Sequence, residues 1–123
     1  MNVLSLFDGI SVGYWALQRA GIEVNKYYAS EIDEYALQVS ERNYLDIIRL
    51  GDVRNWQEWN IDWANIDLLI GGSPCQGFSF AGKQLNFEDE RSKLFFEYVD
   101  ILNHLRTVNP NIKFLLENVI MKK

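Results

Sequence analysis

Cysteine and long apolar runs are scarce in this sequence, and their scarcity excludes several classes of protein. The 123 residues contain one cysteine, Cys75, which excludes an internal disulfide and a zinc site built from several thiolates. No apolar run approaches the roughly 18 residues that a membrane span needs. Met1–Ser5 lacks the basic lead and apolar run of a signal peptide. We therefore expect a soluble, intracellular protein with no membrane partner, located in the cytoplasm or nucleoid if the source is a bacterium or a phage.

Basic residues are also fewer than acidic residues. The chain has 12 lysine and arginine residues against 17 aspartate and glutamate residues, a formal net charge of -5. A module that holds DNA phosphates unaided is usually basic, so we do not expect this chain to bind nucleic acid by itself. Its apolar fraction of 48% and charged fraction of 24% are typical of one folded domain rather than a disordered segment.

Short apolar runs alternate with segments of helical period, a pattern typical of α/β folds. The predicted strands cover residues 3–7, 24–30, 46–50, 66–70 and 112–116. The predicted helices cover residues 12–20, a segment capped by Asp33, residues 55–64 and residues 94–105. Residues 72–91 have no period and predict a long, functional loop. The order predicts a single α/β domain over residues 1–123, with a mostly parallel sheet, right-handed crossovers and helices on both faces.

A polar side chain follows each predicted strand. These residues are Asp8, Glu31, Asp52, Cys75 and Glu117. In open α/β sheets the ligand lies outside the carboxyl ends of the strands. We therefore expect all five side chains at one rim of the sheet.

The turn that contains Asp8, together with Glu31 and Asp52, suits an adenosine-containing cofactor, although each has a simpler interpretation. The turn Phe7–Gly13 lets the backbone approach a ligand, but its spacing is not the dinucleotide fingerprint, and a plain strand-to-helix turn is the alternative. Glu31 can accept hydrogen bonds from ribose hydroxyls, or be a solvated loop carboxylate. Asp52 can accept from an adenine amine, or be an ordinary turn aspartate.

Cys75 and the pair Glu117-Asn118 suit chemistry on a base. Glycines flank Cys75 in a loop at a strand tip, which favours a nucleophile over a buried structural cysteine. Glu117 and Asn118 have the groups to read a base edge, with a polar strand cap as the alternative. For His104 we expect a surface or packing role. For the stripe of Trp56, Trp59 and Trp63 we expect packing in the core rather than base stacking.

Together these segments resemble the cytosine carbon-5 DNA methyltransferases over essentially the whole chain. Pro74-Cys75-Gln76 is similar to the family's catalytic motif, and Glu117-Asn118-Val119 to its companion motif. The opening Leu6-Phe7-Asp8-Gly9-Ile10 is similar to the first cofactor motif, and Ala29-Ser30-Glu31 and Gly51-Asp52-Val53 to the second and third. Leu94-Phe95-Phe96-Glu97 is similar to the segment after the catalytic loop. The resemblance implies a Rossmann-like methyltransferase fold, with S-adenosyl-L-methionine as cofactor and double-stranded DNA as substrate.

The resemblance also implies a mechanism. The target cytosine is flipped out of the duplex, the Cys75 thiolate adds to carbon 6, and Glu117 holds and protonates ring nitrogen 3. Carbon 5 then takes the methyl group, and Asn118 supports the catalytic loop. The resemblance assigns the ribose to Glu31 and the adenine amine to Asp52. The other implied cofactor-binding residues are Phe7, Asp8, Gly9, Ile10, Ile32, Val53, Pro74 and Leu94.

Two departures from the family qualify this assignment. Ser11 stands where many members have a second glycine, and the sequence ends before the family's arginine motif, recognition region and closing cofactor motif. We therefore expect a half-domain truncated after the fifth strand, which leaves that strand with an open edge. DNA contact would then need the family's C-terminal half. The alternatives are a non-catalytic remnant and one half of a split enzyme with a complementing chain. A cysteine hydrolase would need His104, which is predicted away from the rim.

Overall fold

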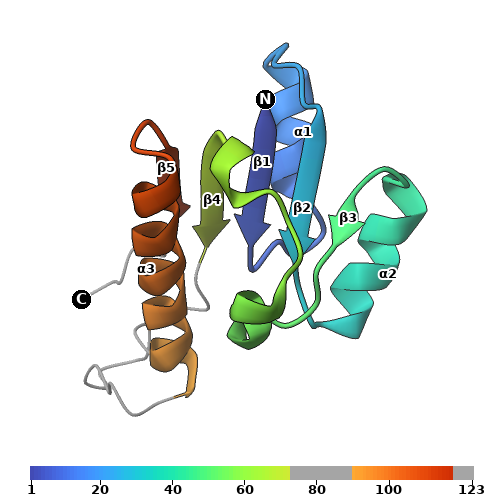
Figure 1. Cartoon of the computed structure of the whole chain (residues 1–123). Helices are drawn as coiled ribbons and strands as arrows, with labels where there is room; N and C mark the ends of the chain where they lie inside the picture. The colour runs from blue at the N-terminus through green and yellow to red at the C-terminus, as the bar shows by residue number, and fades with distance from the viewer. Residues whose placement is uncertain (73–89, 118–123) are drawn as a thin grey trace, which may run out of the picture.

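A five-stranded parallel sheet forms the centre of the protein (Figure 1). The computed structural model describes residues 1–72 and 90–117. In this part of the chain the strand order is β3-β2-β1-β4-β5. This confirms the predicted α/β fold with a parallel sheet. The strands are β1 (Asn2–Leu6), β2 (Lys26–Ser30), β3 (Ile48–Arg49), β4 (Leu68–Gly72) and β5 (Lys113–Glu117).

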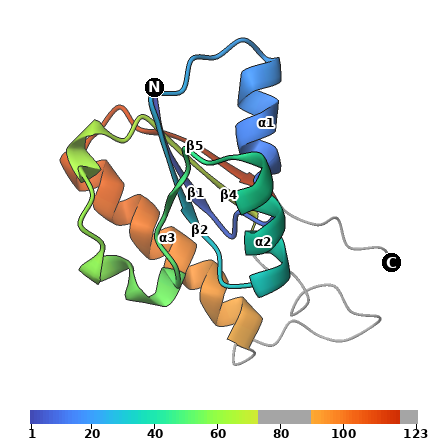
Figure 2. The same ribbon diagram turned by 90° about the vertical axis from the view of Figure 1, so that its right-hand side faces the viewer.

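Helices cover both faces of the sheet, as predicted. Figure 2 shows α1 and α2 on one side, and α3 with the two short helices on the other. Apolar side chains alternate along each strand and divide the core accordingly. The helices are α1 (Val12–Arg19), α2 (Glu34–Asn43), the 3₁₀ helices η1 (Val53–Glu58) and η2 (Trp63–Asn65), and α3 (Glu90–Val108). Leu4, Leu6, Leu69, Tyr98 and Ile101 pack on the α3 side, and Val3, Tyr14, Tyr27, Ala29 and Ile47 on the other.

The ends of the elements differ from the predicted ends by a few residues. The third strand is reduced to Ile48–Arg49, and the fourth extends through Gly71 to Gly72. A Cβ atom on Gly71 would lie 2.8 Å from the carbonyl oxygen of Leu6 and 3.1 Å from the ring of Tyr98. Glycine therefore permits close packing of β1, β4 and α3 at this point. The predicted cap of α2 is confirmed, because the Asp33 side chain accepts a hydrogen bond from the backbone of Tyr35.

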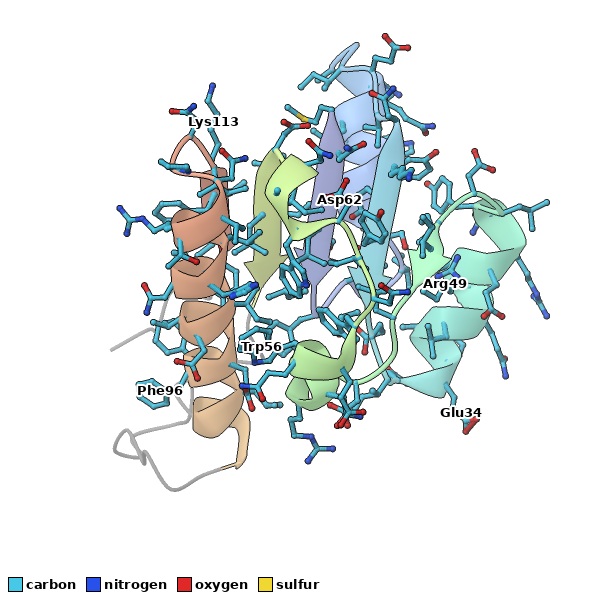
Figure 3. All side chains as sticks on the ribbon, in the orientation of Figure 1. Glu34, Arg49, Trp56, Asp62, Phe96 and Lys113 are labelled. Atoms are coloured by element: carbon cyan, nitrogen blue, oxygen red, sulfur yellow. The ribbon has the colours of Figure 1, made fainter. Side chains whose placement is uncertain are left out.

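The single helix predicted over residues 55–64 is wrong. Trp59 ends η1 in an extended conformation, and a second short helix begins at Trp63. Asparagine and aspartate flank Ile61 between them, and both residue types favour turns over helix interiors. The predicted packing role of the tryptophans is nevertheless confirmed. The rings of Trp59 and Trp63 stack at 6.2 Å, and His104 of α3 lies 4.8 Å from Trp63, while Trp56 is seen between η1 and α3 (Figure 3).

Strand β5 forms an edge of the sheet. Within residues 1–72 and 90–117 it pairs only with β4. Phe114 and Leu115, on opposite sides of this strand, are 50% and 62% exposed. The open edge expected from the sequence is therefore present in the described part of the chain. None of the helices described there is long and apolar enough to cross a membrane.

Candidate functional site

A cavity of about 340 Å³ opens at the carboxyl ends of the strands. Six of the predicted cofactor-binding residues line it: Phe7, Glu31, Ile32, Asp52, Val53 and Leu94. They come from the segments after β1, β2 and β3 and from the first half of α3. Ser30, Arg54 and Gly72, which were not among the predicted cofactor-binding residues, complete the lining. The rule that ligands bind at the carboxyl ends of parallel strands therefore located the cavity correctly.

The turn after β1 has an unusual backbone. Phe7, Gly9 and Ser11 have φ angles of 56°, 64° and 71°. Only glycine takes this left-handed conformation freely, and a residue with a side chain costs about 1–3 kcal/mol there. The backbone amide of Gly9 donates to Oε1 of Glu31 over 2.7 Å. The turn is therefore tied directly to the carboxylate expected to bind ribose.

Asp8 is directed toward the protein rather than toward the cavity. Its carboxylate accepts hydrogen bonds from Ser5 Oγ at 2.6 Å, from the Tyr27 hydroxyl at 2.7 Å and from the Ser11 hydroxyl. Burial, and next the nearby Asp8 carboxylate, raise the pKa of Tyr27, so this phenol remains a donor. Asp8 lines a second cavity of about 470 Å³, on the α1 side of the sheet. Ile10 is 46% exposed and does not line either of these cavities.

Glu31 is held by three backbone amides. Oε1 accepts from Gly9 at 2.7 Å, and Oε2 accepts from Ile32 and Asp33 at 3.1 and 3.0 Å. An ionised carboxylate has about four acceptor sites. One acceptor position on Oε1 therefore remains for a hydroxyl group of a ligand, and the carboxylate is fixed in place before any ligand arrives.

Asp52 is paired with Arg54. Nη2 of Arg54 lies 2.7 Å from Oδ2 of Asp52, and the Arg54 backbone amide donates to Oδ1 over 2.9 Å. Hydrogen bonds from Arg54 hold the pKa of the Asp52 carboxyl below its usual value. Burial raises the pKa of Glu97 on α3. The charge of Asp52 raises this pKa further, and the charge of Arg54 lowers it. Sequence analysis missed Arg54, although an aspartate before a short helix, with arginine two residues later, was a possible signal.

The residues predicted to act on the base lie only partly within the described ranges. Cys75 and Asn118 fall outside them, as does Pro74, which was predicted to bind the cofactor, and of Glu117 the structure describes only the backbone. That backbone pairs with Gly72, the last residue of β4. The strand that leads to Cys75 and the strand that ends at Glu117 therefore finish side by side at the cavity.

The lining suits the adenosine part of a cofactor. Phe7, Ile32 and Leu94 offer apolar surfaces to a ring, while Glu31 and Asp52 offer carboxylates to hydroxyl and amine groups. The described residues contain no cluster of His, Cys, Asp and Glu side chains arranged to hold a metal ion. An open parallel sheet with such a cavity at the carboxyl ends of its strands defines the class: a protein with a Rossmann-like fold.

Known proteins make this assignment specific. Over residues 1–121 the chain matches the family described as C-5 cytosine-specific DNA methylase, and it belongs to that family, whose members use S-adenosylmethionine. The orphan methyltransferase M.Rho11sI of Bacillus phage rho11s is 38% identical, over 96% of this chain and 24% of its own length. The type II methyltransferase M.NlaIV of Neisseria lactamica is also 38% identical, over 97% of this chain and 27% of its own length. The chain therefore spans about a quarter of these relatives.

Solved structures support the same fold. A mutant of DNMT2 from Spodoptera frugiperda has a TM-score of 0.65 and 26% identity, covering 96% of this chain and 35% of that one. Dnmt2 of S. pombe has a TM-score of 0.63 and 23% identity, covering 97% and 36%. The five-stranded sheet is thus a Rossmann-like methyltransferase fold.

Proposed function

We propose that this chain is the cofactor-binding and nucleophile-bearing part of a DNA (cytosine-5-)-methyltransferase. In this proposal the methyl group of S-adenosylmethionine passes to carbon 5 of a cytosine flipped out of double-stranded DNA. The chain forms one domain, and its catalytic residues are Cys75, Glu117 and Asn118. Contact with DNA depends on a basic region outside these 123 residues, since their net charge is -5.

One observation carries the proposal: Gly72 connects the proposed cofactor cavity with the strand that ends at Glu117. It lines the cavity that suits adenosine, and it pairs with Glu117 across β4 and β5. Cys75 follows it by three residues. A methyl donor in the cavity and a base beside Glu117 would therefore be neighbours, as direct transfer requires.

Each cavity residue has a proposed task toward the cofactor, which supplies an electrophilic methyl group when bound. Glu31 accepts from the ribose through its remaining acceptor position, and Asp52 accepts from the adenine amine. Phe7, Ile32, Val53 and Leu94 enclose the adenine. Asp8, Gly9, Ile10 and Pro74 act through the backbone or shape of the turns around the cofactor, since the Asp8 side chain is engaged by Ser5, Ser11 and Tyr27.

In the proposed reaction the base undergoes an addition and then an elimination. The sulfur of Cys75 forms a bond to carbon 6 while Glu117 delivers a proton to nitrogen 3, which makes carbon 5 electron-rich. Carbon 5 then takes the methyl group as the bond between that group and the cofactor sulfur breaks, which would leave the thioether S-adenosylhomocysteine. Loss of the carbon 5 proton to solvent restores the ring double bond and releases the Cys75 thiolate, and the proton on nitrogen 3 returns to Glu117. Asn118 holds the loop that carries the cysteine.

Calorimetric titration with S-adenosylmethionine tests the cofactor site. Glu31→Ala removes the anchored carboxylate, and we expect affinity to fall about tenfold or more, since a lost hydrogen bond to a charged group costs about 1.5–3 kcal/mol. Glu34→Ala is the matched control, because this exposed glutamate begins α2 and does not line the cavity (Figure 3). Equal affinity of the two variants, or no binding by a folded wild-type chain, would contradict the proposed cofactor site.

Methyl transfer to double-stranded DNA tests the chemistry. Label should enter cytosine carbon 5 when the wild-type chain is fused to the remainder of a relative such as M.Rho11sI, which supplies the DNA contact, and not when the Cys75→Ser chain is fused to it. A second candidate, a half-enzyme that needs a complementing chain, is favoured by the exposed apolar side chains of Phe114 and Leu115 on β5. In that case transfer should also begin when the same remainder is supplied as a separate second polypeptide. No transfer in either arm would leave the non-catalytic remnant.

A further inference from the structure

A series of hydrogen bonds joins Arg49 of β3 to Asp8 in the turn after β1. Nη1 of Arg49 donates to Oγ of Ser40 over 2.8 Å, and the Oγ atoms of Ser40 and Ser11 lie 2.5 Å apart. The Ser11 hydroxyl then donates to Oδ2 of Asp8. Ser11 and Ser40 are both 0% exposed, so this relay, as we call these four residues, passes through the interior. Arg49 is visible between β3 and α2 in Figure 3.

The groups at the two ends fix the direction of every hydrogen bond in the relay. A guanidinium group only donates, and a carboxylate only accepts. Ser40 therefore accepts from Arg49 and donates to Ser11, and Ser11 donates to Asp8. Each buried hydroxyl has both a donor and an acceptor as partners, so removing any member leaves another buried polar group without one of its bonds.

The relay ends in the turn after β1, where two residues with side chains have a left-handed backbone. Phe7 and Ser11 both have a left-handed backbone, with φ angles of 56° and 71°. The side chain of Phe7 lines the cavity, and this placement depends on the unusual φ angle. Because a phenylalanine or serine does not hold such a conformation by itself, contacts elsewhere must hold the turn. Ser11 is at once a left-handed residue and a member of the relay.

We infer that Ser11, Ser40 and Arg49 are positioning residues, which hold residues 7–11 in the shape that lets Phe7 form a wall of the cofactor cavity. None of the three lines the cavity, so they would act through the turn. The identity of the ligand rests on the proposed function. A serine at position 11 would then add a specific connection, which a glycine in its place would lack.

Two substitutions interrupt the relay without touching the cavity. Ser40→Ala removes a hydroxyl from α2, where alanine favours the helix, and Arg49→Met keeps the aliphatic stem but removes the donor. In calorimetric titrations with S-adenosylmethionine we expect each to weaken binding about tenfold. Because both break the same series, the double variant should bind about as weakly as either single variant. Arg49→Lys, which keeps a donor, should bind more tightly than Arg49→Met.

Glu41→Gln is the matched control, because Glu41 lies 4.0 Å from Arg49 but outside the relay. It should bind like the wild type. Wild-type affinity in Ser40→Ala and Arg49→Met, or independent losses that multiply to about a hundredfold in the double variant, would overturn the inference. A general weakening of the fold would lower the unfolding midpoint and would not produce this saturation.

A measurement without cofactor separates this inference from the proposed function. In nuclear magnetic resonance spectra of the cofactor-free chain, Ser40→Ala should shift the backbone amide signals of Gly9 and Ser11, whereas Glu41→Gln should leave them in place. Unchanged signals in Ser40→Ala would overturn the positioning role. If the wild type does not bind S-adenosylmethionine but these shifts occur, the proposed function fails and the role of the relay in shaping the turn stands.

Discussion

Gly71→Ala should strongly destabilise the sheet beside the cavity. An added Cβ would lie 2.8 Å from the carbonyl oxygen of Leu6, so reaching an ordinary contact of 3.4 Å requires a shift of roughly 0.6 Å. The obstructing atom belongs to the backbone of β1, which is paired on both sides, and cannot rotate away. The Tyr98 ring, at 3.1 Å, blocks movement toward α3. We expect a loss of about 2–3 kcal/mol, typical of overpacking in a core.

Urea unfolding followed by far-ultraviolet circular dichroism measures this loss, and a melt should show a decrease of roughly 6–15 °C. Gly21→Ala is the matched control, because it adds the same atom where no other atom lies within 4 Å. Its φ angle of 77° limits its expected cost to about 1 kcal/mol. If Gly71→Ala loses no more than Gly21→Ala, the steric reasoning is wrong.

Three further substitutions test individual groups. Arg54→Met removes the cause of the lowered pKa of Asp52, so Asp52 should become protonated at a higher pH than in the wild type. When S-adenosylmethionine binding is titrated at a series of decreasing pH values, the variant should therefore lose binding at a higher pH than the wild type. Burial raises the pKa of Glu97, because the ionised carboxylate is less stable in the folded chain than in water. At a pH above the usual glutamate pKa, the charge on Glu97 therefore opposes folding. Glu97→Gln should therefore raise the free energy of unfolding at neutral pH but not in acid, as measured in urea. Asn109→Ala removes the 2.8 Å hydrogen bond to the Ile66 carbonyl and should cost about 1–2 kcal/mol in the same assay.

The rim of the sheet was predictable because it follows from topology. Alternating strands and helices dictate a parallel sheet, and Glu31 and Asp52 follow its strands, so their convergence needed no knowledge of side-chain contacts. The task of Asp8 was not accessible in this way, because its partners Ser5, Ser11 and Tyr27 are chosen by three-dimensional packing.

Other features depended on contacts between distant segments. Ser40 and Ser11 are separated by 29 positions, and no local pattern reveals their hydrogen bond. The helix predicted around Trp59 failed because tryptophan spacing indicates a buried side but does not distinguish an α-helix from two short turns. Cys75 and Asn118 lie outside the described residues, so their roles stay predictions from the motif.

The central position of β1 determines the order in which the sheet can assemble. Its neighbours β2 and β4 begin at Lys26 and Leu68, so one side of β1 finds its partner early during synthesis and the other much later. The apolar side chains of Leu4 and Leu6 also pack with Tyr98, Ile101 and Leu105 of α3, so their packing surface is complete only after that helix has left the ribosome. The first fifty residues would therefore form a provisional three-stranded unit, which the later strands and α3 convert into a stable core.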